Sequence, residues 1–215
     1  MCEREAGWRA PVEAMVVVVG LCVFALLAHR GGALRVISFC GLGVAAMGIA
    51  WSLGSSASPS TIMGVGLVSR KAMVWIGVGC ALGVACGMAY RVGYGRSALP
   101  ARLTGFVVVA AAVGAVEELV YRGYVQGRVC CWGAVSAVVF AAAAHTAYKT
   151  ALFALPPDGM PVNYPLLIGA TLGGGLVFGA MRERSGSVLG PLASHAVFDI
   201  LAYGDWAQTP WWVWS

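Results

Sequence analysis

The sequence predicts an all-α protein, a polytopic transmembrane helix bundle of about seven spans. Hydrophobic residues make up 60% of the 215 residues, charged residues make up only 11%, and the mean hydropathy is +0.81. Apolar runs of about 17 to 20 residues recur along the chain, which is the length that a helix needs to cross the hydrocarbon core of a bilayer. No shift in composition and no long polar linker divides the chain, so we expect residues 1–215 to form a single integral membrane domain.

The predicted helices follow the apolar runs in order along the chain. The first run comes after Arg4 and Arg9, as in a signal peptide, but acidic residues dilute this basic region and no small-residue cleavage site follows, so we interpret it as a membrane span. We expect a Ser-rich loop at residues 54–60, a re-entrant or interfacial piece at 61–68, and the clearest break at 156–161, where prolines and a glycine interrupt the chain. The spans are expected at about residues 12–28, 36–53, 72–90, 103–120 or beyond, 132–155, 165–181 and 188–203.

The formal net charge of +5 is spread over short loops, without the clustered basic face that nucleic-acid binding requires. We therefore expect no nucleic-acid partner and expect the loop cations to contact solvent or lipid headgroups. Lys and Arg are nearly balanced between the two sides of the predicted spans, which only slightly favours a cytoplasmic N-terminus. The seven cysteines lack the spacing of metal ligands, and we interpret them as reduced packing residues.

Glycines at helical spacing form two ladders of small residues, which let neighbouring membrane helices approach closely. We interpret both ladders as packing surfaces and leave homodimerisation through one of them, and thus the oligomeric state, open. The ladders consist of Gly79, Gly83 and Gly87, and of Gly169 and Gly173 followed by Gly175 and Gly179. Near the C-terminus, tryptophans predict an interfacial anchor. They are Trp206, Trp211, Trp212 and Trp214.

Charged residues end one apolar run at Glu117, Glu118 and Arg122. A charge at the centre of a membrane helix costs about 2.5 to 3.5 kcal/mol on insertion scales, so such residues are seldom kept without a use. Glu118 and Arg122 are four residues apart and share a helix face, which predicts an ion pair. Glu117 points about 100° away from Glu118, so we expect it to be an available carboxylate outside that pair.

Two histidines lie in later apolar runs. If the chain turns at residues 128–133 as an antiparallel helix hairpin, Glu117 and His145 each lie roughly 20 Å along their helices from the turn and meet at similar depth. His195 and Asp199 are four residues apart, so the carboxyl group is placed to fix the imidazole tautomer or, when protonated, to donate a hydrogen bond. By these boundaries His195 lies ~9 Å shallower than His145, which requires either an offset last helix or a different boundary.

Three polar clusters on three predicted helices favour a functional site. Taken singly, each has a structural explanation, because a lone histidine is often a hydrogen-bonded packing residue and Glu118 with Arg122 can be a structural ion pair. A zinc peptidase is one alternative, since Glu and His bind zinc, but the sequence contains no HExxH pair and the ligands would have to converge from three helices. Proton or ion transport is another, against which the lack of inverted-repeat spacing argues.

These residues resemble the CPBP family, which groups type II CAAX prenyl endopeptidases with bacteriocin-processing and self-immunity proteins of prokaryotes. The family motif EExxxR is intact at Glu117, Glu118 and Arg122, and the motif HxxxN or HxxxD is present as His195 and Asp199. Together with a second motif, which is altered and lies between these two, they form three motifs in the family's order on successive spans, and this order makes the resemblance fairly specific.

The second family motif, FxxxH, is altered in this chain. Position 141 is Ala and Phe140 stands one residue early, although His145 is present. The resemblance covers the motif-bearing half, about residues 100–203, while the first three predicted spans match only in being hydrophobic. It implies a multi-helix membrane bundle.

The resemblance further implies a metal-independent intramembrane endopeptidase without a cofactor. By similarity, Glu117 is the general base, which activates a water with help from His145, while His195 and Asp199 form the side that stabilises the oxyanion. The ion pair of the first motif, Glu118 with Arg122, holds the architecture of the site.

The implied substrate is a peptide or protein cleaved near the membrane surface, with a need for lipidation left open. We expect membrane lipid as the surroundings and a multi-pass location in a prokaryotic cell membrane. An ionised Asp199 would repel an oxyanion, so it must be protonated or act only by orienting His195. The alternative function is a non-catalytic membrane immunity or partner-binding protein on the same scaffold, which the altered second motif and Asp199 favour.

Overall fold

The computed structural model describes residues 8–66, 68–156, 161–207 and 210, and it contains no strand among these residues. The predicted all-α fold class is therefore confirmed. The elements are α1 (Arg9–Leu27), α2 (Gly32–Gly54), α3 (Pro59–Met63), α4 (Arg70–Gly93), α5 (Phe106–Glu118), the π-helix η2 (Leu119–Val125), α6 (Gln126–Arg128), the 3-10 helix η3 (Cys130–Trp132), α7 (Ala134–Phe153), α8 (Tyr164–Ser185) and α9 (Leu189–Ala202).

Four helices are long and apolar enough to cross a membrane, namely α1, α2, α4 and α8. The expectation of about seven spans is not confirmed by length and composition. α9 is apolar but has only 14 residues. α7 is a continuous helix of 20 residues, but His145 and other polar side chains lower its hydropathy. α5, η2 and α6 follow one another without a break, so they form one helical rod.

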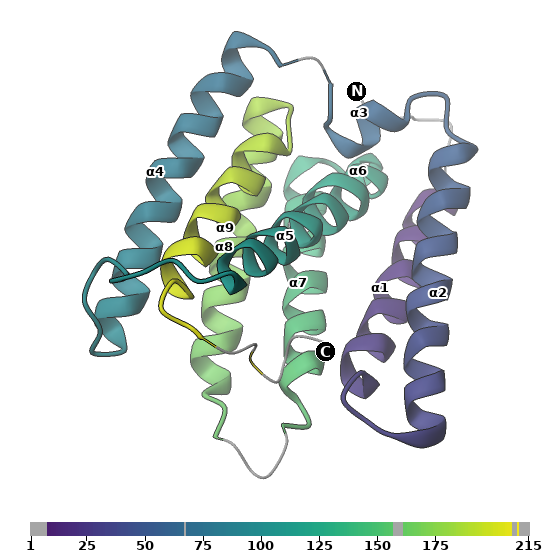
Figure 1. Ribbon diagram of the computed structural model, residues 1–215. Helices are drawn as coiled ribbons and strands as arrows, with labels where there is room; N and C mark the ends of the chain where they lie inside the picture. Colours follow the sequence, from purple (N-terminus) through teal and green to yellow (C-terminus); the bar gives the residue numbers. More distant parts are fainter. Residues whose placement is uncertain (1–7, 67, 157–160, 208–209, 211–215) are drawn as a thin grey trace.

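The helices pack mainly in pairs (Figure 1). α1 lies along α2, α4 along α9, and α7 along α8, while α5 also packs on α9 and α1 on α7. The rod that begins with α5 runs obliquely across the other long helices in Figure 1. Most residues from Tyr121 to Val129 are buried, so the second half of this rod forms the centre of the bundle.

The first glycine ladder packs α4 directly on the backbone of α9. A Cβ atom added at Gly79 would overlap the carbonyl oxygen of Gly190, and one at Gly83 would overlap that of Ser194. At Gly87 it would lie 2.8 Å from Cβ of Leu201. Because these glycines have no side chain, the backbone of α9 lies close to α4, as expected for a packing surface.

The second glycine ladder divides into two parts. A Cβ atom at Gly175 would lie 2.8 Å from Cβ of Ala142, and one at Gly179 would lie 2.8 Å from Cγ1 of Val138. These two glycines therefore allow α7 to pack closely against α8. At Gly169 and Gly173 a Cβ atom would meet no atom within 4 Å. The internal packing role is therefore confirmed for the second half of this ladder only.

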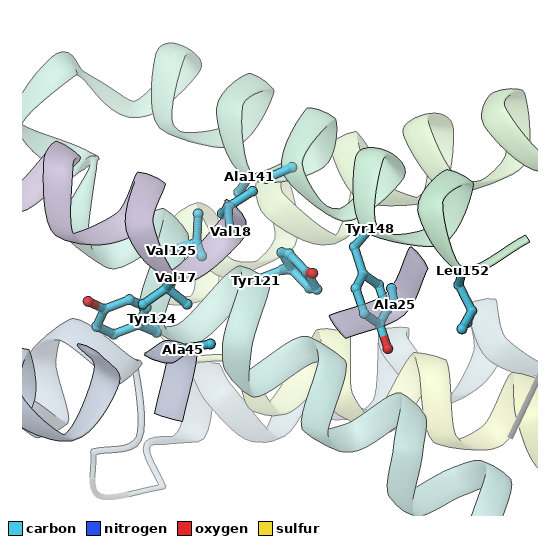
Figure 2. Packing of buried hydrophobic residues seen from close by; sticks show 11 residues of the cluster. Val17, Val18, Ala25, Ala45, Tyr121, Tyr124, Val125, Ala141, Tyr148 and Leu152 are labelled. Carbon is cyan, nitrogen blue, oxygen red and sulfur yellow. The ribbon is translucent and has the colours of Figure 1, made fainter. Parts of the chain in front are cut away.

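A hydrophobic cluster joins the rod to α1, α2 and α7 (Figure 2). Tyr121 and Tyr124 of η2 are almost fully buried and point into this cluster together with Tyr148 of α7. Val17 and Val18 of α1 fill the space beside them. Because burying an aromatic or aliphatic side chain contributes about 1.5 to 3 kcal/mol, this cluster fixes the rod firmly against α7.

A buried arginine fastens the ends of α4 and α9. Arg91 is 1% exposed, and its guanidinium donates to the carbonyl of Ser97 at 2.7 Å, the carbonyl of Leu201 at 3.1 Å and Oδ2 of Asp205 at 2.6 Å. The expectation that Arg91 contacts solvent or headgroups is wrong, since a planar guanidinium with several donors can be buried when carbonyls surround it.

A second buried cation links the rod to the first two helices. Arg128, at the end of α6, forms an ion pair with Glu13 of α1, and Ser52 of α2 donates to the same carboxylate at 2.7 Å. The paired charges remove the penalty that a lone buried charge would carry. Polar contacts therefore fix both ends of the bundle around the rod.

The structure describes six of the seven cysteines and one of the four tryptophans near the C-terminus. Five cysteines are free, namely 22, 40, 80, 86 and 131, whereas Cys130 is disulfide-bonded, so the expectation of reduced cysteines is wrong for Cys130. Cys2, Trp211, Trp212, Trp214 and most of the break at 156–161 lie outside the described residues. Trp206 is half-buried and contacts Tyr203, with ring centroids 5.5 Å apart.

Candidate active site

The two adjacent carboxylates end α5 where the helix widens into the π-helix η2. Glu118 is fully buried and Arg122 is 1% exposed; Nη1 of Arg122 lies 3.1 Å from Oε1 of Glu118. The pairing expected from their spacing is therefore present in the structure. Single π-helical turns inside α-helices occur frequently at functional sites, because the wider turn changes which side chains share a face.

His145 reaches the rod from α7 because the chain reverses between Val129 and Gly133. Its Nε2 lies 3.2 Å from Oε2 of Glu117, and its ring stacks on that of Tyr121 with centroids 4.5 Å apart. The expected turn at residues 128–133 thus brings these two side chains together. Stacking and burial hold the imidazole plane in one orientation.

A neighbouring arginine sets the tautomer of His145. Nη1 of Arg122 lies 2.8 Å from Nδ1 of His145, and a guanidinium can only donate. Nδ1 must therefore accept, which leaves the proton of the neutral imidazole on Nε2. His145 then donates to Oε2 of Glu117 and has no free basic nitrogen.

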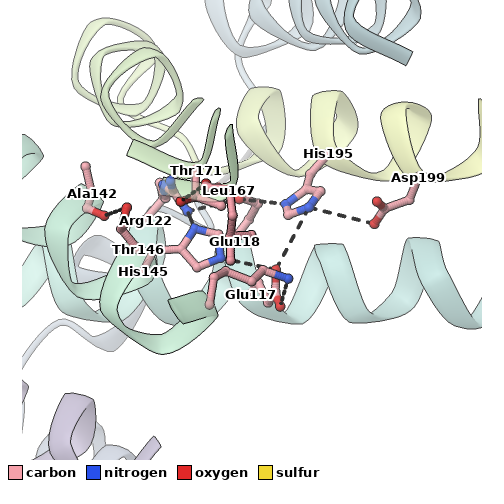
Figure 3. A network of polar contacts seen from close by, with 11 residues as sticks. Glu117, Glu118, Arg122, Ala142, His145, Thr146, Leu167, Thr171, His195 and Asp199 are labelled. Atoms are coloured by element: carbon pink, nitrogen blue, oxygen red, sulfur yellow. Dashed lines mark hydrogen bonds and ion pairs between the residues drawn. The ribbon is translucent and has the colours of Figure 1, made fainter. Parts of the chain in front are cut away.

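His195 and Asp199 come from α9, which approaches the rod at a glycine. A Cβ atom at Gly114 of α5 would overlap Oδ2 of Asp199 and lie 2.9 Å from Cδ2 of His195. Nε2 of His195 lies 3.9 Å from Oε2 of Glu117 and 3.8 Å from Oδ2 of Asp199. The three predicted polar clusters therefore converge in one place (Figure 3).

Glu118 orients His195 more closely than Asp199 does. Oε1 of Glu118 lies 2.8 Å from Nδ1 of His195, whereas the distance to Asp199 exceeds that of a hydrogen bond. Because a carboxylate accepts, Nδ1 of His195 carries a proton. Glu118 rather than Asp199 therefore holds the proton on Nδ1, while Nε2 lies 3.8 Å from Asp199 and 3.9 Å from Glu117.

The rings of the two histidines lie closer together than the ~9 Å difference in depth that the predicted boundaries imply. Their ring centroids are 6.3 Å apart. α9 begins at Leu189 and α7 at Ala134, within two residues of the expected boundaries. Both helices thus begin near the predicted boundaries, and an offset of the last helix stays a prediction.

Lys149 is a site residue that was not predicted from the sequence, although it lies within the span expected at residues 132–155. It lies one turn beyond His145 on α7, and its Nζ is 2.6 Å from Oε1 of Glu117. Glu117 is therefore not the unpaired carboxylate that we expected. The spacing of four residues from His145 was the signal that would have placed Lys149 on the same face.

The polar cluster does not have the form of a metal centre. No group of three or more His, Cys, Asp or Glu side chains within the described ranges is arranged to hold a metal ion. Instead, Nδ1 of His145 faces Arg122 and Oε1 of Glu117 faces Lys149, so cations already occupy coordinating positions. The arrangement suits proton transfer between an acidic and a basic group.

Comparison with known proteins identifies the half of the chain that carries these residues. Residues 99–201 match the model of the family described as Rce1-like, Type II CAAX prenyl endopeptidase. The motif-bearing part of the chain is therefore similar to that family. Searches of curated proteins and of solved structures gave no match.

The Rce1-like half spans α5 to α9 and therefore contains every residue of the polar cluster described above. The resemblance predicted from the motifs, over about residues 100–203, is thus confirmed. The match to this family indicates a protease, and together with the long apolar helices it indicates an integral membrane protein. A peptide or protein substrate follows from that activity.

Proposed function

We propose that the chain is an intramembrane endopeptidase that hydrolyses a peptide bond near the membrane surface, with Glu117 as the general base. The observation that carries this proposal is the convergence of Glu117, His145 and His195 from three helices. Oε2 of Glu117 lies 3.2 Å from one imidazole and 3.9 Å from the other. Such a group, buried in an Rce1-like half, has the elements that water activation requires.

In the proposed first step, Oε2 of Glu117 takes a proton from a water molecule. The resulting hydroxide attacks the carbonyl carbon of the scissile peptide bond. Nε2–H of His145 orients the carboxylate, because its tautomer makes it a donor. General base catalysis of this kind contributes about 10²- to 10⁴-fold.

His195 supports the second side of the reaction. Its Nδ1–H donates to Glu118, so a proton on Nε2 makes it an imidazolium that can donate to the developing oxyanion. One such donor contributes about 3 kcal/mol to stabilising the transition state. Asp199, at 3.8 Å, fits this role in its protonated form, since a second negative charge would oppose the oxyanion.

The tetrahedral intermediate then collapses and the carbon–nitrogen bond breaks. Glu117 returns its proton to the leaving amine, and the new carboxyl group remains on the other product. Glu118 contacts His195, Arg122 contacts His145, and the two contact each other, so their role is to hold the two imidazoles in place. Independence from metal and a prokaryotic membrane location are part of this proposal.

The competing functions have less support. The family match does not favour a non-catalytic immunity or partner-binding protein. A zinc peptidase would need ligands that are instead engaged by Arg122 and Lys149. Retention of activity after strict removal of metal ions would distinguish the proposed reaction from zinc catalysis.

The test compares the wild-type protein with Glu117→Gln in liposomes, using reporter peptides with a C-terminal CAAX sequence in prenylated and unprenylated forms. We expect cleavage to fall by about 10²- to 10⁴-fold in the variant. Glu183→Gln is the matched control, because Glu183 lies on α8 and is bound to Gln126 rather than to a histidine. Full cleavage by a folded Glu117→Gln protein would rule out the proposed base, and comparison of the two peptides tests the need for lipidation.

A further inference from the structure

Lys149 is a cation at the candidate active site for which the proposed reaction has no role so far. The chain contains two lysines. Lys71 is exposed at the start of α4, whereas the side chain of Lys149 is only 16% exposed and its ammonium contacts Glu117. A long, flexible and strongly hydrated side chain is seldom held in such a position without a partner that compensates for its desolvation.

The two oxygens of Glu117 face different partners. Oε2 lies near both histidines, and Oε1 lies 2.6 Å from Nζ of Lys149. Apart from this ion pair, Oε1 is buried without a hydrogen-bond partner among the described residues. Lys149 therefore determines how the carboxylate is rotated, and with it the direction in which Oε2 points.

Lys149 is also the cation that balances the charge of Glu117. The buried Arg122 already contacts Glu118 and His145, and no ion pair joins it to Glu117 within the part of the chain that the structure describes. A buried carboxylate without a counter-charge takes up a proton rather than staying ionised. A protonated Glu117 could not accept a proton from water.

We propose that Lys149 is a positioning residue for the hydrolytic reaction, which holds Glu117 ionised and aims its Oε2 at the attacking water. This inference rests on the proposed function of Glu117. Lys149 acts through that carboxylate and does not touch the reacting atoms. Its removal should therefore lower kcat while leaving KM nearly unchanged, because binding of the peptide does not depend on it.

The test uses Lys149→Met, Lys149→Gln and Lys149→Arg, with Lys71→Met as the control for loss of a lysine. We expect kcat to fall by about 10²-fold in the Met and Gln variants, with KM within about threefold of the wild-type value. The Arg variant keeps the charge and should recover at least about tenfold of the lost kcat. Lys71→Met should behave like the wild-type protein.

The same assay distinguishes failure of this proposal from failure of the proposed function. If Glu117→Gln is active, the assignment of the base itself is wrong. If Glu117→Gln is inactive but Lys149→Met or Lys149→Gln keeps wild-type kcat, only the role of Lys149 is refuted. Equal losses in the Gln and Arg variants would also refute it, because they would show that shape and not charge matters.

A structural role would give a different pattern. Should Lys149→Met fail to fold, Lys149→Gln retains a polar side chain and supplies the same comparison. In the Glu117→Gln background, replacing Lys149 should cause no further loss of activity, since the two residues act as one unit. An additional loss of tenfold or more in that background would contradict the proposal.

Discussion

Gly114 offers a test of whether the placement of α9 matters for activity. In Gly114→Ala, the new Cβ atom would lie 2.9 Å from Cδ2 and 3.1 Å from Cγ of His195, and it would overlap Oδ2 of Asp199. Carbon atoms in ordinary contact are about 3.5 to 4.0 Å apart. The imidazole must therefore move by roughly 0.5 to 1 Å away from α5.

The expected effects on stability and on activity differ in size. Replacing glycine by alanine within a helix contributes about 0.5 to 1 kcal/mol of stability, whereas overpacking costs about 1 to 3 kcal/mol. The net change in unfolding free energy is therefore between about zero and 2.5 kcal/mol of destabilisation. A displacement of about 1 Å at a reacting group lowers the rate up to about 10²-fold, so kcat should fall by one to two orders of magnitude while the protein still folds.

The assay measures cleavage of the reporter peptide and thermal unfolding in the same preparation. Gly43→Ala is the matched control, because Gly43 lies within α2 and a Cβ atom there would meet nothing within 4 Å. That variant should keep full activity and gain slightly in stability. Wild-type kcat in a folded Gly114→Ala protein would refute the argument that activity requires His195 in its present position.

Two further predictions concern a fully buried ion pair and a partly buried one. Arg122→Met should lower the unfolding free energy by about 3 to 5 kcal/mol, because it leaves Glu118 buried without its cation; adding Glu118→Gln should restore part of the loss, and an unchanged unfolding midpoint would contradict this. A hydrogen bond from Arg91 holds the pKa of Asp205 below its usual range, so this contact stabilises the protein above a pH of about 4 and is lost as the pH falls through the lowered pKa. Asp205→Asn should accordingly be less stable than wild type at pH 7 in thermal unfolding, and a difference that persists fully in strong acid would disprove the pairing.

The sequence predicted those parts of the site that lie on one helix. Glu118 and Arg122 are four residues apart, and this spacing is enough to place them on one face. The turn near residue 131 could also be recognised, since it is a break in an otherwise apolar run. Local spacing and apolar periodicity are properties of the chain itself, so they were sufficient to predict the helices and the meeting of Glu117 with His145.

Contacts between helices were harder to predict. The link from Glu118 to His195 depends on how α9 rotates about its own axis, and that rotation is set by Gly114 and by the ladder on α4. Lys149 falls within the span expected at residues 132–155, but its contact with Glu117 could not be predicted because it depends on how α7 packs against the rod. The π-helix η2 left no mark in the hydrophobic pattern, because residues 121–125 are buried whichever way they point.

The polar contacts of the site form one continuous series in which cations, carboxylates and imidazoles alternate. Its members are, in order, Lys149, Glu117, His145, Arg122, Glu118 and His195. Each residue between the two ends of this series contacts the residue before it and the residue after it. The carboxylate of Glu118 accepts hydrogen bonds from Arg122 and His195. Oε2 of Glu117 and Nε2 of His195 instead face each other across 3.9 Å, with Asp199 3.8 Å from the same nitrogen. In the proposed reaction these two atoms belong to the base and to the oxyanion donor, and their separation is too long for a direct hydrogen bond that would occupy both.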